Sequence, residues 1–288
     1  MPSIKEYTDK IASLRNTHKM TRTMKMVSAS KLRKAQHAQR EASRYAAALS
    51  DVISRLAASV DSSAHPLLTP REKPKRALLV VFSSDKGLCG SFNHGVVKAA
   101  RAWMAERKDR YEEIHLAYAG RRAYMALGRR FPLRAHHEDV TARPSFEGAQ
   151  AIVDDFTEGF LDGTYDEVHL LYNTFKSAIS QKPIFLQALP IEPAEVIHEA
   201  TKYEANYTFE PSTKELLAEL LPKTVTFKIY FALLENAAGE HGARMSAMDS
   251  ATSNAESMID DYTLLRNRAR QAAITTELTE IISGAEAL

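Results

Sequence analysis

Two long stretches of this sequence contain neither glycine nor proline. The first runs from Ser3 to His65 and the second from Ala243 to Ser283. Glycine and proline are the residues least compatible with a helix interior, and both stretches carry apolar residues at helical spacing. The sequence therefore predicts very long helices at both ends of the chain around a compact middle. Such an architecture is more typical of a shaft, lever or scaffold than of an enzyme.

The C-terminal part of the chain, from Phe227 to Tyr262, carries a seam in which steps of four and three residues alternate. This 3.5-residue repeat is typical of a left-handed coiled coil. The seam positions are Phe227, Phe231, Leu234, Ala238, His241, Met245, Met248, Thr252, Ala255, Ile259 and Tyr262. A helix from near Ser212 to Ser283 would be on the order of 100 Å long. We expect Pro222 to begin this helix or to kink it, because proline removes a backbone hydrogen bond.

The first stretch carries two adjoining heptad frames. One frame holds Tyr7, Leu14, Ala35, Ala42, Leu49 and Leu56, and the other holds Ile4, Ile11, Leu32, Ala46 and Ile53. Between them the stripe is interrupted by His18, Thr21, Lys25 and Ser28, and nearby apolar residues are Met20, Met24 and Val27. We expect these apolar residues to carry the buried face, which would shift the seam as a stutter does. If one domain lies between the helices, they must run antiparallel and can pack together.

Charge and cysteine content restrict the class of protein. Residues 1–45 hold eleven Lys or Arg against only Glu6, Asp9 and Glu41, which favours an acidic partner. Nucleic acid, anionic lipid and an acidic protein loop all fit, and a solvated helix face is the plain alternative. Cys89 is the only cysteine, which excludes an intrachain disulfide and a cysteine-based metal site. No apolar run approaches the roughly 18 residues that span a bilayer, so we expect a soluble or peripheral intracellular protein.

The middle of the chain is typical of an α/β domain. Prolines between His65 and Pro74 end the first helix. The expected strands are Ala77–Phe82, Ile114–Ala119, Val168–Phe175 and Pro183–Pro190, and the expected helices are Asn93–Arg107, Arg121–Arg130 and Phe146–Leu161. This alternation predicts a Rossmann-like, mostly parallel sheet. The chain then divides into residues 1–65, 66–208 and 209–288.

Three features of the middle region suggest chemistry. The loop Ser83–Gly90 follows the first strand, where such folds bind phosphates, but it matches neither nucleotide-binding glycine motif. Gly87 and Gly90 are more simply turn residues. Cys89 would need a positioned base such as His94 to act as a nucleophile, and a small buried thiol is the simpler interpretation.

The third feature is the run His136-His137-Glu138-Asp139, which has the composition of a metal site. Adjacent residues of an extended chain point to opposite faces, so they are poor joint ligands. The sequence shows no catalytic triad, no paired carboxylates and no zinc spacing. We therefore expect no catalytic residues, no metal and no cofactor.

Three separated motifs resemble the gamma subunits of F-type ATP synthases. They are Lys10–Gln36 (KIASLRNTHKMTRTMKMVSASKLRKAQ), Asp85–Gly90 (DKGLCG) and Arg268–Gly284 (RARQAAITTELTEIISG). The run that begins at Glu235 (ENAA) adds to them, so the resemblance extends over the whole chain. Pro222, Gly239 and Gly242 depart from the family pattern, and we expect the two glycines to soften the last helix.

The resemblance implies a non-catalytic, rotating central stalk that transmits torque between an ion-driven membrane ring and a catalytic ring. Its implied partners are the alpha and beta subunits, the epsilon subunit and the membrane c-ring, without nucleic acid or membrane insertion. Its implied location is the cytoplasmic side of the inner membrane, as a peripheral protein. The positions that match family contacts with the catalytic ring are Met24, Lys25, Arg244, Gln271, Thr275, Glu277 and Glu280. The positions that match family contacts at the membrane foot are Tyr207 and Glu210.

Two alternatives remain open at this stage. Met24 is as well suited to core packing as to partner contact, because methionine often fills gaps. A coiled-coil protein that binds nucleic acid through its basic first helix is the second candidate for the whole chain. That candidate predicts binding that weakens steeply with salt. The basic stretch lacks a pattern of aromatic or polar residues that would read bases, which counts against it.

Overall fold

The computed structural model describes residues 3–58, 65–128, 131–191 and 213–286. Its contacts divide the chain into two units, which are described separately below. One unit consists of Met1–Ala29 and Arg244–Leu288, and the other is Ser30–Ala243. Each of the two long helices contributes to both units.

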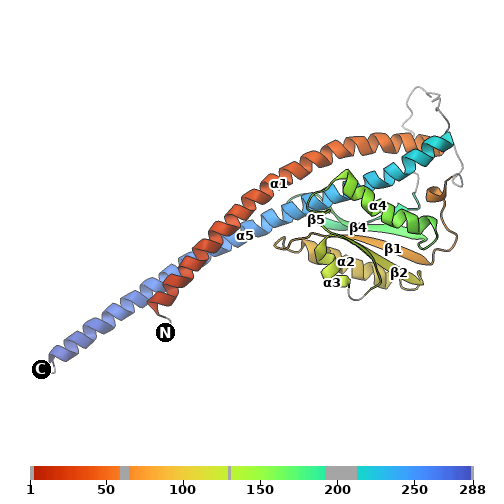
Figure 1. The fold of residues 1–288 in the computed structure, drawn as a ribbon. Helices are drawn as coiled ribbons and strands as arrows, with labels where there is room; N and C mark the ends of the chain where they lie inside the picture. Colours follow the sequence, from red (N-terminus) through yellow and green to blue (C-terminus); the bar gives the residue numbers. More distant parts are fainter. Residues whose placement is uncertain (1–2, 59–64, 129–130, 192–212, 287–288) are drawn as a thin grey trace. The chain divides into compact units, whose positions relative to one another are not determined.

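The two long terminal helices predicted from the sequence are confirmed (Figure 1). Helix α1 spans Ile4–Ala58 and helix α5 spans Thr213–Glu286. Between them lie η2 (Pro66–Leu68), β1 (Arg76–Phe82), α2 (Phe92–Glu106), β2 (Glu113–Ala119), α3 (Arg121–Leu127), β3 (Leu133–His137), α4 (Phe146–Leu161), β4 (Glu167–Phe175) and β5 (Gln181–Leu189). The expected elements are all present, and β3 is an additional strand that the sequence pattern did not reveal.

The unit Ser30–Ala243 contains one five-stranded sheet, in the order β3-β2-β1-β4-β5. Strands β1 to β4 are parallel, and β5 joins β4 as an antiparallel edge strand. Strand β1 is central, and it is apolar from Ala77 to Phe82 because both of its faces are covered. Ala77, Leu79 and Val81 pack with α2 and α3, whereas Leu78 and Val80 pack with α4 and α5. The sheet is therefore mostly parallel and Rossmann-like, as predicted.

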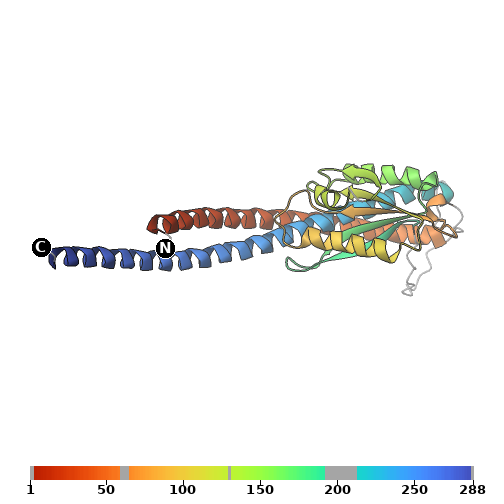
Figure 2. The ribbon, with the colours of Figure 1, turned by 90° about the horizontal axis from the view of Figure 1, so that it is seen from below.

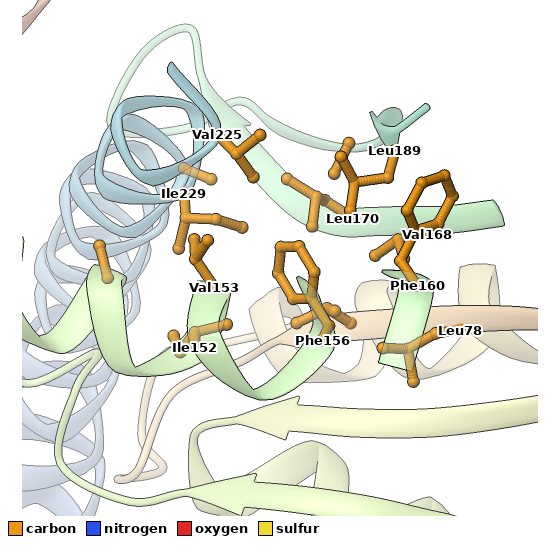
Figure 3. Close-up of a cluster of buried hydrophobic side chains, with 14 of the residues drawn as sticks. Leu78, Ile152, Val153, Phe156, Phe160, Val168, Leu170, Leu189, Val225 and Ile229 are labelled. Atoms are coloured by element: carbon orange, nitrogen blue, oxygen red, sulfur yellow. The ribbon is translucent and has the colours of Figure 1, made fainter. Parts of the chain in front are cut away.

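The core on the second face joins helix α5 to the sheet (Figure 3). Phe156 of α4 lies among side chains of the sheet and of α5. The other labelled members are Leu78, Ile152, Val153, Phe160, Val168, Leu170, Leu189, Val225 and Ile229. Because these side chains come from five separate elements, namely β1, α4, β4, β5 and α5, this part of α5 is a core element of the domain.

Helix α5 runs through Pro222, so our expectation that the helix begins there is wrong, whereas a kink at Pro222 stays a prediction. A proline inside a helix costs about 3 kcal/mol. Leu221, Val225 and Ile229 are fully buried next to it, and burial of each such side chain contributes about 1.5–3 kcal/mol. The packing of this face outweighs the local cost of the proline.

The two long helices run antiparallel in the unit of residues 1–29 and 244–288. Thr252 Oγ1 donates a hydrogen bond to Thr21 Oγ1 at 2.8 Å, and the rings of Tyr7 and Tyr262 lie 6.3 Å apart. Increasing numbers on α1 therefore meet decreasing numbers on α5. The antiparallel coiled coil predicted from the heptad patterns is confirmed.

The predicted stutter in α1 is wrong. Thr21 and Ser28 are buried, with 8% and 3% of their surface exposed, whereas Met20 and Val27 are 64% and 51% exposed. The seam therefore keeps its heptad phase and uses small polar side chains in place of apolar ones. The Thr21 hydroxyl donates a hydrogen bond to the backbone carbonyl of His18 and accepts one from Thr252. Its burial therefore leaves no polar group of this side chain unpaired.

Gly239 and Gly242 allow α5 to lie close to the sheet, which gives them a different role from the softening that we expected. A Cβ atom on Gly239 would lie 3.0 Å from Cε2 of Phe92. A Cβ atom on Gly242 would lie 3.0 Å from Cε2 of Phe175 and 3.1 Å from Cα of Ala178. The absence of side chains at these two positions lets the helix approach the β4–β5 turn.

We predict that Gly242→Leu destabilises the unit Ser30–Ala243. Leucine favours a helix by roughly 1 kcal/mol over glycine, but its side chain would overlap Phe175 and the backbone of Ala178, at a cost of about 1–3 kcal/mol. The matched control is Gly95→Ala in α2, where the space around the new Cβ is open, and we expect it to stabilise slightly. Urea unfolding followed by circular dichroism measures both changes. An increase in stability for Gly242→Leu would contradict this account of the close packing.

Candidate partner-binding surfaces

The loop after β1 lies at the carboxyl edge of the sheet, where α/β folds commonly bind ligands. Its polar groups are used to fasten neighbouring elements. Ser83 Oγ accepts a hydrogen bond from the backbone N–H of Ala123 at 3.0 Å. Asp85 accepts one from the backbone N–H of Arg121 at 3.1 Å and one from Thr141 Oγ1 at 2.9 Å. A phosphate brought to the start of α3 would meet the Asp85 carboxylate, so the geometry disfavours nucleotide binding at this loop.

Cys89 is a buried thiol, as expected. It packs with Phe92 and Ala243, and its Sγ lies 3.2 Å from Nδ2 of Asn93. An amide cannot act as the base that a nucleophilic cysteine needs. Gly90, next in sequence, has a φ of 56°, which fits its predicted role as a turn residue.

The two histidines of β3 point to opposite faces, as the period of an extended strand requires. The ring of His136 stacks on Tyr124 with centroids 4.3 Å apart, whereas His137 Nε2 lies 3.5 Å from Asp155 Oδ2 of α4. Burial lowers the pKa of the His137 imidazole, although the nearby Asp155 carboxylate acts in the opposite direction. Within the described residues, no three His, Cys, Asp or Glu side chains are arranged to hold a metal ion.

A charged cluster around the buried Glu167, at the amino edge of the sheet, was not identified in the sequence. Glu167, the first residue of β4, accepts hydrogen bonds from Nη2 of Arg110 at 2.6 Å and from the hydroxyl of Tyr111. Its carboxylate also lies 2.9 Å from Nε2 of His169, whose ring packs against Trp103. Arg110 and Glu167 are 57 residues apart, and no local pattern relates them. The cluster fastens β4 to the segment after α2. Its charged and polar side chains form hydrogen bonds and ion pairs with one another.

Burial alone would raise the pKa of the Glu167 carboxyl. The hydrogen bonds from His169 and Tyr111 and the charge of Arg110 outweigh that effect and lower the pKa to about 2. A carboxyl whose pKa is lower in the folded state stabilises the fold above its unfolded pKa of about 4.3. This contribution is lost as the pH falls from that value towards 2.

We predict that the free energy of unfolding falls between about pH 5 and pH 2 by roughly 2 kcal/mol more in the wild-type chain than in Glu167→Gln. The difference arises because glutamine cannot take up a proton in this range. Urea unfolding at a series of pH values measures it. Glu112→Gln is the matched control, since the Glu112 side chain is 67% exposed and pairs with Lys75 at the surface. Equal pH profiles for wild type and Glu167→Gln would contradict the role assigned to this carboxyl.

The residues that the family resemblance implies in partner contact lie mainly on the unit of residues 1–29 and 244–288. Gln271, Thr275, Glu277 and Glu280 are all exposed on the last part of α5. Met24 and Lys25 are half-buried on α1. Arg244 differs from them, because only 9% of its surface is exposed. Tyr207 and Glu210 lie outside the described residues.

Lys25 already has a partner within the chain. Its ammonium group lies 2.5 Å from Asp249 Oδ1, and both side chains are about half exposed. An ion pair of this kind contributes at most about 1 kcal/mol, because water screens it. The pair therefore orients Lys25 on the coiled coil, and a partner protein can replace Asp249 at little cost.

The last part of α5 extends beyond the first residues of α1 as a single helix (Figure 2). Tyr262 is the last seam position that meets α1, opposite Tyr7. Large apolar side chains continue beyond that contact and are exposed, namely Leu264, Leu265, Ile274, Leu278, Ile281 and Ile282. A run of exposed apolar residues of this size is typical of a surface that another protein covers. In the described part of the chain, no helix has both the length and the apolar content to cross a membrane.

The fold and this helix end define a class of protein, a coiled-coil shaft with an α/β domain that functions within a larger assembly. Comparison with known proteins specifies the family. A family model described as ATP synthase matches residues 3–288. The ATP synthase gamma chain of Geobacter metallireducens is 47% identical over 288 residues, which cover all of this chain and 99% of that protein. The corresponding chain of Trichlorobacter lovleyi is 44% identical with the same coverage. This chain therefore belongs to the ATP synthase gamma chain family, as its three motifs indicated.

Solved structures agree with this assignment. A central-stalk chain from the mitochondrial ATP synthase of Tetrahymena thermophila has a TM-score of 0.60 at 27% identity, covering 81% of this chain and 99% of that one. A chain of the Euglena gracilis mitochondrial ATP synthase has a TM-score of 0.68 over 99% of this chain and 94% of that one. At 19% identity, the second likeness supports the fold alone.

Proposed function

We propose that this chain is the rotating central stalk of an F-type ATP synthase and transmits torque between an ion-driven membrane ring and the alpha/beta catalytic ring. The single observation that carries this proposal is the free end of α5, with its exposed apolar residues. A helix that presents such residues to water gains free energy when a partner covers them. A ring of larger subunits around the end of the shaft would supply that cover.

The mechanism follows from the asymmetry of the shaft. One α5 helix cannot present the same side chains to three equivalent catalytic subunits at once. At any angle, the shaft therefore stabilises a different conformation in each of them, and rotation changes these conformations in turn. This is differential binding to conformational states, driven mechanically.

The residues of the catalytic-ring contact are proposed from the match to family positions. Gln271, Thr275, Glu277 and Glu280 offer exposed polar groups beside the apolar residues of α5. On α1, the half-buried Lys25 offers a cation to an acidic loop of a ring subunit, with Met24 next to it. Charge complementarity of this kind fixes orientation and register more than it adds affinity.

We further propose that the two terminal segments, residues 1–65 and 209–288, form the long helices of the shaft and that residues 66–208 form the α/β domain, which packs on Leu221, Val225 and Ile229 of the second segment. Tyr207 and Glu210 would contact the membrane c-ring, with the epsilon subunit beside them. The chain would be a peripheral protein on the cytoplasmic side of the inner membrane. It would contribute no catalytic group, since the loop after β1 presents the Asp85 carboxylate where a nucleotide phosphate would need a hydrogen-bond donor.

We predict that this chain copurifies with the alpha, beta and epsilon subunits from membranes washed with high salt. A nucleic-acid-binding protein held by phosphate contacts would be lost in such a wash. Affinity purification through a tag on the native complex, followed by mass spectrometry, provides the measurement. The purified chain alone should hydrolyse no ATP. Recovery of the alpha and beta subunits without this chain would contradict the proposal.

We predict that Glu277→Lys impairs coupling and leaves assembly intact, because Glu277 is exposed and its replacement does not disturb the coiled coil. Proton pumping per ATP hydrolysed should fall severalfold, because a lysine at this position would lose the proposed contact through which torque reaches the catalytic ring. Arg244→Glu should act in the same direction, but its burial makes misfolding a competing explanation.

The matched control for Glu277→Lys is Glu256→Lys, an exposed acid on the same helix that matches none of the contact positions. We expect nearly normal pumping from the control. An unchanged pumping yield in Glu277→Lys would remove Glu277 from the proposed contact.

A further inference from the structure

Glu235 of α5 is a buried acid that connects three separate segments of the unit Ser30–Ala243. Only 6% of its surface is exposed. Its Oε1 accepts a hydrogen bond from Nε2 of Gln39 on α1. Its Oε2 accepts a second from the backbone N–H of Phe175, the last residue of β4, at 3.0 Å. One side chain thus fastens both long helices to the carboxyl edge of the sheet.

The next residue along α5 adds a contact to the neighbouring strand. Nδ2 of Asn236, a fully buried side chain, donates a hydrogen bond at 3.2 Å to the carbonyl oxygen of Ser83, which directly follows β1. Strands β1 and β4 are adjacent and parallel, so their ends lie side by side. Two consecutive residues of one helix therefore bind the ends of two neighbouring strands.

These contacts resist a motion that apolar packing tolerates. The core beneath α5 opposes separation of the helix from the sheet, but apolar contacts are not directional and offer less resistance to rotation of the helix about its own axis. Hydrogen bonds weaken steeply as their angle changes. A carboxylate held at both oxygens fixes the helix in rotation, and Gly239 and Gly242 keep the adjacent turn of α5 close to the β4–β5 turn.

We propose that Glu235 is the positioning residue that locks the sheet to α1 and α5 and sets the torsional stiffness of this part of the molecule. Torque applied to the sheet then passes to both helices together. The functional part of this inference rests on the proposed role of the chain as a rotating stalk. The structural part, the locking of three segments by one carboxylate, stands independently of that role.

The structural part is tested on the full-length chain by hydrogen exchange. In Glu235→Ala the N–H of Phe175 loses its acceptor, so we expect its exchange to accelerate by about tenfold. Gln39→Glu places two carboxylates together and should produce a similar loss. Glu219→Ala is the matched control, because Glu219 is an exposed acid of α5 that pairs only locally with Lys223. Unchanged exchange at Phe175 in Glu235→Ala would overturn the proposal.

The double variant Gln39→Glu/Glu235→Gln distinguishes a specific lock from a general loss of stability. The amide carbonyl at position 235 can accept from Phe175, and its NH2 group can donate to the carboxylate at position 39. Both hydrogen bonds are thereby restored with donor and acceptor exchanged. We expect the exchange rate of the Phe175 N–H to return to within about twofold of the wild-type rate. If the Phe175 N–H exchanged as fast in the double variant as in Glu235→Ala, loss of the paired hydrogen bonds would not be the cause of the faster exchange.

The functional part is tested in the assembled complex, through the angular fluctuations of a bead attached to the stalk while the catalytic ring is fixed. We expect a wider angular distribution for Glu235→Ala, and wild-type width for the double variant and for Glu219→Ala. Faster exchange with an unchanged angular width would leave Glu235 a purely structural residue and overturn its proposed effect on stiffness. A stalk that does not rotate at all would contradict the proposed function instead, and the exchange results would still decide whether the lock exists.

Discussion

The buried face of α5 that contains Leu221, Val225 and Ile229 is the constraint on which the domain depends. This face packs on α4 and on one side of the sheet, so the helix supplies part of the hydrophobic core. A helix that only contacted the surface of the domain could be removed without exposing that core. Here its removal would expose the part of this face that α4 does not cover, which makes α5 up to Ala243 and the α/β domain a single folding unit.

The same helix meets a different environment in the unit of residues 1–29 and 244–288. There it pairs with α1 through a seam that includes Thr21, Ser28 and Thr252, and these side chains gain less from burial than leucine or isoleucine would. Small seam residues permit close approach of the helices, but they provide modest stability. The ends of the helices therefore depend more on a partner than the domain does, and the exposed apolar residues beyond Tyr262 fit that dependence.

Polar groups within the domain serve mainly to fasten its elements to each other. Asp85 joins the loop after β1 to α3, Glu167 joins β4 to the segment after α2, and Glu235 joins β4 to both long helices. Their common effect is rigidity, which is what the proposed transmission of torque demands of this domain.

The sequence by itself determined the long helices, the central apolar strand β1, the bounds of α4 and the family, because these depend on local periodicity and contiguous motifs. Strand β3 was missed because an edge strand with Arg134, His136 and His137 lacks an apolar signal. The phase of the seam, the tolerance of Pro222 and the contacts of Glu235 were decided only in the tertiary structure. Each depends on residues far away in the chain, which compensate a local cost or supply a partner that no short window of sequence contains.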